Sequence, residues 1–148
     1  MPLITKNKRA FYDYEILEKF EAGIVLTGQE VKSTKNGYIN LTGSYVIIRG
    51  NGAYLVGAHI AAYKFAGRLK DYDSQHTRKL LLRKKELSYL AGKGQEKGLT
   101  ILPLLVYTNP RGKIKVEIGI GRGKKKFEKR EAIKEREVSR KIRKEYGI

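Results

Sequence analysis

The strongest pattern in the chain is an alternation of hydrophobic and polar residues. Within Lys113–Gly121, isoleucine or valine occupies every second position from Ile114 to Ile120. This period of two predicts a strand with one buried face and one solvated face that carries Lys115. Weaker or shorter β-like runs predict further strands at Tyr14–Phe20, Ala22–Thr27, Ser44–Arg49, Ala53–Ile60, Arg78–Leu82 and Leu99–Tyr107.

Turn sequences separate several of these runs. Gly50-Asn51-Gly52 and Asn109-Pro110-Arg111-Gly112 both lie between two predicted strands. Glycine and asparagine tolerate the positive φ of tight hairpins, so both sites predict antiparallel pairs. Asn36-Gly37 is interpreted as another turn.

Two short helices are expected among the strands, at Gly28–Thr34 and at Lys84–Ala91. Leu87 and Leu90 share one side of the second, and Gly92 is its expected C-terminal stop. Residues 1–10 contain few hydrophobic side chains and are interpreted as a loose, flexible leader.

The order of elements predicts a mainly β fold. The βαβ alternation of a parallel sheet is missing, and six or seven short antiparallel strands favour closure because a closed sheet has no exposed edge. We expect an OB-like closed antiparallel six-stranded β-barrel with a few short helices over residues 1–124, with a small sandwich as the alternative. Residues 125–148 are expected to form a basic C-terminal tail.

The net charge of the chain indicates what kind of partner the protein binds. The chain has 148 residues with 32 Lys and Arg against 15 Asp and Glu, a formal net charge of +17. Such a field attracts polyanions, and nucleic acid is favoured over an anionic membrane because no amphipathic helix with bulky apolar anchors is evident. No apolar run is long enough to cross a bilayer.

Positive charge is dense at the C-terminus. Residues 121–148 hold 12 Lys and Arg against 5 acids. Acid–base pairs at helical spacing and a thin stripe of Val138, Ile142 and Tyr146 predict a segment that is marginally helical alone. We expect the tail to be disordered when free and helical when a partner supplies contacts.

Two features leave both a structural and a functional interpretation open. The glycines of Gly119–Lys126 allow close approach to a phosphate beside Arg122 and Lys124, or the segment is a flexible exit linker. Glu30 is either a helix-surface carboxylate paired with Lys32 or Lys35, or an acceptor for an RNA base edge or 2′-hydroxyl.

Other chemistry has little support in the sequence. There is no cysteine, and His59 and His76 lie 17 residues apart without the spacing of a zinc site. We expect no metal, no cofactor and no catalysis, because no nucleophile–base motif is present. Both histidines are interpreted as structural or surface residues. The absence of cysteine and of an apolar leader favours a cytoplasmic location.

Six sequence blocks in order resemble the SmpB family of SsrA-binding proteins. They lie at Glu21–Ser33, Arg78–Leu82, Ala91–Lys93, Glu96–Thr100, Arg122–Lys125 and Glu128–Glu137. The resemblance implies an RNA-binding barrel with contacts at Glu30, Lys32, Leu81, Arg83, Lys93, Lys115, Arg122, Gly123, Lys124 and Lys125. It also implies a ribosome-contacting tail with Lys129, Arg130, Lys134 and Arg136. The sequence departs from the family pattern at Glu128, where Asp is more usual, and at Arg83, where Asn or His is.

The resemblance further implies a function. Members of the family bind the tRNA-like domain of transfer-messenger RNA (tmRNA) and deliver it to stalled ribosomes for trans-translation. The tail then occupies the empty decoding site and mRNA channel of the small subunit, and elongation factor Tu takes part through the charged RNA. We expect a monomer. A general single-strand-binding OB module and a ribosomal protein remain the alternatives.

Overall fold

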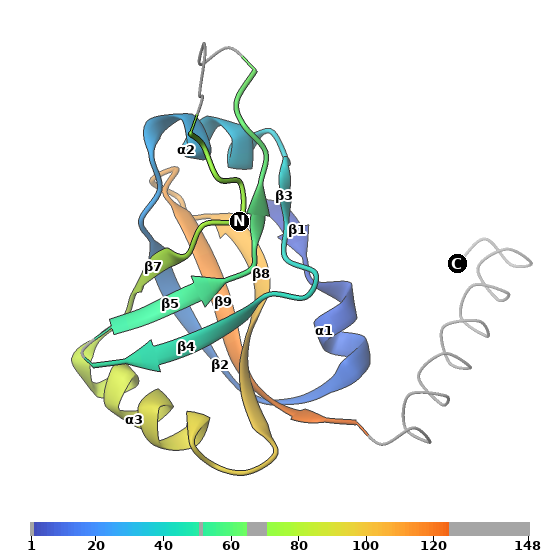
Figure 1. Ribbon diagram of the computed structural model, residues 1–148, viewed down its shortest axis with the longest axis vertical. Coiled ribbons are helices and arrows are strands. Elements are labelled where there is room, and N and C mark those ends of the chain that lie inside the picture. Colours follow the sequence, from blue (N-terminus) through green and yellow to red (C-terminus); the bar gives the residue numbers. More distant parts are fainter. Residues whose placement is uncertain (1, 51, 65–70, 125–148) are drawn as a thin grey trace, which may run out of the picture.

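The computed structural model describes residues 2–50, 52–64 and 71–124. Over these residues the chain forms nine strands and three short helices (Figure 1). In chain order they are β1 (Leu3–Lys6), α1 (Lys8–Asp13), β2 (Tyr14–Ile24), α2 (Gly28–Lys35), β3 (Ile39–Asn40), β4 (Tyr45–Arg49), β5 (Gly52–Val56), β6 (His59–Ile60), β7 (Arg78–Leu81), α3 (Lys84–Gly94), β8 (Leu99–Thr108) and β9 (Ile114–Gly123).

Six strands close into a ring, which confirms the OB-like barrel. The order β8-β4-β5-β7-β2-β9 returns to β8 through the β8–β9 pair, and every pairing is antiparallel. β1 pairs with β8 outside the ring, and β3 pairs with β6 as a separate two-stranded sheet. The contact between β4 and β8 is the thinnest part of the ring, because Val46 and Ile101 are the one residue pair that joins these strands in the described chain.

The hydrophobic residues of the predicted alternation form part of the core. Ile114, Val116, Ile118 and Ile120 of β9 are all buried, and each such side chain contributes roughly 1.5–3 kcal/mol relative to remaining exposed. Helix α3 lies at one end of the barrel (Figure 1) and places Leu90, which is fully buried, in the same core cluster. The Gly50 turn also forms as expected, since Arg49 pairs with Gly52 across the β4–β5 hairpin.

Three boundaries differ from the expectation. The expected strand Ala53–Ile60 forms two strands, β5 and β6, which belong to different sheets. Tyr14–Ile24 is one continuous strand with a bulge at Leu17, not two runs. Helix α3 continues past Gly92 to Gly94, and Gln95 caps it. A Cβ added at Gly92 would meet no atom within 4 Å, whereas one added at Gly94 would lie 3.4 Å from Ile101 Cδ1. The last turn of the helix therefore packs against the barrel, and this packing outweighs the weak helix propensity of glycine.

The prediction of a loose leader at residues 1–10 is wrong. Leu3 pairs with Tyr107 of β8, and the chain then enters α1. Asn7 explains why this segment is ordered: its side chain is buried, donates to the Pro103 carbonyl at 2.8 Å and accepts from the Ala10 amide at 3.2 Å. One amide side chain thus anchors the segment and caps the helix.

The interpretation of Gly119 and Gly121 as phosphate-facing glycines is also wrong. A Cβ at Gly119 would lie 2.6 Å from Leu104 Cδ1, and one at Gly121 would lie 3.0 Å from Tyr14 Cβ. Leu104 belongs to a second small cluster with Ala10 of α1. These glycines therefore allow Leu104 and Tyr14 to pack closely against the outer face of β9. That face was expected to be solvated, but the half of it at Gly119 and Gly121 is buried.

Candidate nucleic-acid interface

Glu30 lies in the first turn of α2 and is fully buried. Its amide donates to Thr27 Oγ1 at 3.3 Å, and the Thr27 amide donates to Glu30 Oε1 at 3.0 Å. This reciprocal capping box fixes both the start of the helix and the rotamer of the carboxylate. Glu30 is therefore not a helix-surface carboxylate, and Arg78, not Lys32 or Lys35, is its ion-pair partner.

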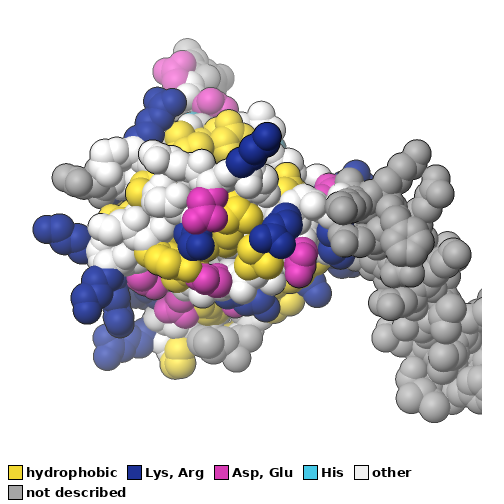
Figure 2. Space-filling view, turned by 90° about the horizontal axis from the view of Figure 1, so that it is seen from below, with side chains coloured by type: hydrophobic (Ala, Val, Ile, Leu, Met, Phe, Trp, Pro, Cys, Tyr) yellow, Lys and Arg dark blue, Asp and Glu magenta, His cyan; other side chains and the backbone are white. Residues whose placement is uncertain are grey.

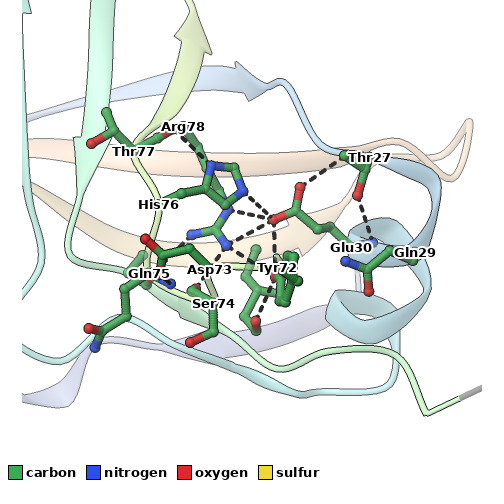
Figure 3. Close-up of polar contacts among 12 residues, drawn as sticks. Thr27, Gln29, Glu30, Tyr72, Asp73, Ser74, Gln75, His76, Thr77 and Arg78 are labelled. Atoms are coloured by element: carbon green, nitrogen blue, oxygen red, sulfur yellow. Dashed lines mark hydrogen bonds and ion pairs between the residues drawn. The ribbon is translucent and has the colours of Figure 1, made fainter. Parts of the chain in front are cut away.

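The other carboxylate oxygen of Glu30 collects three donors (Figure 3). Arg78 donates from Nε at 2.9 Å, the Tyr72 hydroxyl donates at 3.2 Å, and His76 Nε2 lies at 2.9 Å. The Arg78 guanidinium is buried as well and donates to the Ala58 and Ser74 carbonyls. The cluster ties α2 to the loop before β7 and to β7 itself.

The electrostatics of this cluster follow from its partners. Burial alone would raise the pKa of Glu30, but hydrogen bonds from Thr27, Arg78 and His76 and the charge of Arg78 outweigh it. The pKa of Glu30 falls from 4.5 to about 2 as a result. Burial, followed by the charge of Glu30, raises the pKa of Tyr72 above its ordinary value.

His76 is the part of the cluster that reaches the surface. Its side chain is 39% exposed, while that of Glu30 is 1% exposed. Its Nδ1 lies 3.1 Å from the Thr77 carbonyl, so both ring nitrogens face acceptors. The geometry makes Glu30 a positioning residue for His76 and Tyr72, because both of its oxygens are engaged within the protein. Direct RNA contact by Glu30 would require these bonds to break.

Strand β7 leads from this cluster to a surface groove. Arg78 and Leu80 are buried, whereas Lys79 and Leu81 are exposed, as expected for alternating faces. Leu81, with 54% of its surface exposed, lies roughly 10 Å along the strand from Arg78. The ion-pair cluster therefore anchors one end of the strand that presents Leu81.

The groove brings together three of the predicted contacts, Leu81, Arg83 and Lys115. It has a volume of about 520 Å³, and its remaining lining residues are Glu21, Gly23, Leu82 and Glu86. Gly23 lies against Leu81, and the Arg83 amide donates to Glu86 Oε1 at 3.2 Å as α3 begins. Two cations beside an exposed leucine can bind a phosphate and pack against a sugar or base.

The remaining predicted contacts lie elsewhere. Lys32 is exposed on α2, with its Nζ 5.5 Å from the Tyr63 ring centroid. Lys93 pairs with Glu96 at 3.2 Å, and the hydrogen bond to that acid raises the pKa of Lys93.

Arg122, Gly123 and Lys124 lie at the opposite end of β9 from Lys115, roughly 23 Å away along the strand. The Lys124 amide donates to the Asp13 carbonyl, and its Nζ donates to the Phe11 carbonyl at 3.1 Å. A ligand that touches all the predicted positions must therefore be extended. Lys125, Lys129, Arg130, Lys134 and Arg136 lie outside the described residues.

Sequence reasoning missed part of this arrangement. The sequence gives His76 no role beyond a structural or surface one, and it places Arg78 in a strand and in a family block without assigning it a contact. No local sequence signal pairs Glu30 with Arg78, because they are 48 residues apart.

Charged side chains of both signs are mixed on the surface. Figure 2 shows a face on which acidic, basic and hydrophobic side chains are interspersed, with further Lys and Arg side chains projecting at its margin. Within the described ranges, no three His, Asp or Glu side chains group as ligands for a metal ion. In the same part of the chain, no helix has the length and hydrophobicity needed to cross a membrane.

Comparison with known proteins decides the family. The family model described as SmpB protein matches residues 4–147. The chain belongs to the SmpB family. An SsrA-binding protein from Sulfurihydrogenibium sp. (strain YO3AOP1) is 53% identical over 144 residues, covering 97% of this chain and 93% of the relative. One from Coprothermobacter proteolyticus is 47% identical over 148 residues, covering 100% of this chain and 99% of the relative.

A solved structure supports the same assignment. A chain from "tmRNA-SmpB: a journey to the center of the bacterial ribosome" is 44% identical and superimposes with a TM-score of 0.70. The match covers 90% of this chain and 95% of that one. The likeness to the SmpB family therefore extends from sequence to the described fold.

Proposed function

We infer that this protein is a non-catalytic RNA adaptor that binds the tRNA-like domain of tmRNA and delivers it to stalled ribosomes for trans-translation. The observation that carries the proposal is the match to SsrA-binding proteins over nearly the whole chain. The groove of Leu81, Arg83 and Lys115 is the RNA contact on the barrel. Charged tmRNA links the complex to elongation factor Tu, and the protein acts as a monomer in the cytoplasm.

The tail has a separate role in this proposal. Residues 125–148 occupy the decoding site and mRNA channel of the small subunit, with Lys129, Arg130, Lys134 and Arg136 against ribosomal RNA. Their charge supports such a contact, because each cation near a phosphate releases condensed counterions. The Lys129→Ala/Arg130→Ala double variant should therefore bind tmRNA like the parent yet fail to support tagging of stalled peptides. Normal tagging by this variant would refute the division between barrel and tail.

The first test is binding to full-length tmRNA in competition with unrelated tRNA and single-stranded RNA, over a salt series. Specific recognition predicts that tmRNA binding persists at salt concentrations that release both competitors. Equal affinities that fall together would mean a general polyanion binder and would refute the proposal.

Two variants locate the contact. Lys115→Ala should weaken tmRNA binding and lower the slope of log K against log salt by about 1, as for loss of one phosphate contact. Leu81→Ala should weaken binding without changing this slope, because leucine carries no charge. A Lys97→Ala variant, which removes an exposed cation outside the groove, is the matched control for charge.

A further inference from the structure

A second groove lies on the outside of the barrel, shares Glu21 with the first groove and has more acids than cations among its lining residues. It has a volume of about 590 Å³, and its lining residues are Leu3, Lys19, Phe20, Glu21, Leu105, Tyr107 and Glu117. Two of these are acids and one is a cation, in a chain with a net charge of +17. Leu3 is 57% exposed, so the groove also offers apolar surface.

The two acids of this groove are held close together. Glu21 of β2 and Glu117 of β9 are direct cross-strand partners, an arrangement that is destabilising for like charges. Glu21 accepts a hydrogen bond from the Tyr107 hydroxyl. Glu117 Oε1 is shielded from solvent and has no hydrogen-bond partner among the described residues, although Lys19 Nζ lies 3.7 Å away. The pair is therefore incompletely neutralised and favours a cationic ligand.

The C-terminal segment of the same chain has complementary chemistry. Residues 125–148 carry ten Lys and Arg against five acids, together with apolar side chains that include Phe127 and Ile133. A basic segment with interspersed apolar residues fits a groove that combines carboxylates with exposed leucine. Such a contact gains from both electrostatic attraction and burial of apolar surface.

The segment leaves the barrel within reach of the groove, because Glu117 lies roughly 20 Å back along β9 from Gly123. Lys124 Nζ donates to the Phe11 carbonyl, and Lys19 Nζ, which lines the groove, lies 5.9 Å from the Phe11 ring centroid. Phe11 thus lies beside the exit and near Lys19, one lining residue of the groove. About six residues of extended chain span up to roughly 20 Å, which is enough to pass it. Tethering gives a local concentration in the millimolar range, so weak intrinsic affinity is sufficient.

We propose that residues 125–148 bind reversibly in cis to the groove formed by Glu21, Glu117, Leu3 and Leu105. Lys and Arg side chains of the segment pair with the two carboxylates, and an apolar side chain covers the leucines. Binding in this groove keeps the cationic segment from non-specific contact with RNA. A polyanion that binds the segment more tightly releases it from the groove.

The absence of cysteine makes a direct test possible. Ser139→Cys in the full chain gives a unique site for a nitroxide label, and paramagnetic broadening of backbone amides then reports where the segment lies. The proposal predicts selective loss of signal around Glu21, Leu105 and Glu117 at low salt. The signals should recover in the Glu21→Gln/Glu117→Gln variant and, without any substitution, at high salt because screening weakens exposed charge pairs.

The matched control removes two acids outside the groove. Glu15→Gln/Glu96→Gln changes the net charge by the same amount and should leave the broadening in place. Broadening that is uniform, or equal in both double variants, would overturn the proposal. Broadening in unlabelled chains mixed with labelled ones would show binding between two copies and would also overturn it. The salt series tests the proposal even if the groove variant does not fold.

Discussion

The buried pair of Glu30 and Arg78 allows a quantitative prediction for Glu30→Gln. Glutamine keeps the shape of the side chain but leaves the Arg78 guanidinium, which is 1% exposed, without its anion. Breaking a buried ion pair in this way costs about 3–5 kcal/mol in free energy of unfolding at neutral pH. The linkage route gives a similar figure, because lowering the Glu30 pKa from 4.5 to about 2 corresponds to about 3 kcal/mol.

The sign of the pH dependence follows from the direction of the shift. Because the folded-state pKa of Glu30 is below its unfolded value, the ionised carboxylate stabilises the fold fully above pH 4.5. This contribution is lost as the pH falls through about 2. The difference in unfolding free energy between parent and Glu30→Gln should therefore be large at pH 7 and should shrink between pH 4.5 and 2. Other carboxylates contribute to both proteins and cancel in the difference.

The assay is urea unfolding of both proteins at several pH values across this window. Glu96→Gln is the control, since Glu96 forms an exposed pair with Lys93 and should contribute less than about 1 kcal/mol. A difference below about 1 kcal/mol at pH 7, or one that stays constant down to pH 2, would refute the assignment of Glu30 as a buried, ionised anchor.

Three further changes test other parts of the fold. Gly119→Ala places a Cβ 2.6 Å from Leu104 Cδ1 and should reduce the free energy of unfolding by about 1–3 kcal/mol, whereas Gly123→Ala, with nothing within 4 Å, should be neutral in the same urea assay. Asn7→Ala removes a buried hydrogen-bonding side chain and should cost about 1–3 kcal/mol, with faster hydrogen exchange in β1 and α1; unchanged exchange there would contradict the anchoring role. Burial and then the hydrogen bond to Glu21 raise the pKa of Tyr107, so the absorbance difference between parent and Tyr107→Phe should stay flat while ordinary tyrosines titrate near pH 10. A step in that difference at pH 10 would show that the hydroxyl is free.

The fold was predictable where one face of a strand is buried and turns have distinctive residues. The alternation from Ile114 to Ile120 and the glycine turn at Gly50 are local signals, and the structure confirms both the buried face and the hairpin. The N-terminal strand and helix were not predictable in this way. Their order depends on hydrogen bonds from Asn7 to carbonyls far along the chain, including Pro103.

The candidate site was predictable only in part for the same reason. Family resemblance identified Leu81, Arg83 and Lys115, which lie in one groove. The resemblance also identified Glu30. The burial of Glu30, however, depends on Arg78 and His76, which approach it only after β7 joins the barrel. Gly119 shows the reverse case, since a glycine-rich run beside lysines resembles a phosphate site although packing explains it.

The position of β8 in the barrel has a consequence for synthesis. This strand pairs with β1, β4 and β9, so residues from both ends of the described chain meet on it. During translation, β1 and β4 emerge long before β8, and β2 waits for most of its cross-strand partners in β9. Until the last two strands have left the ribosome, the nascent chain exposes unpaired strand edges, which favour aggregation. Closure of the barrel is therefore a late, long-range step, and slow translation between β7 and β9 should prolong the vulnerable period.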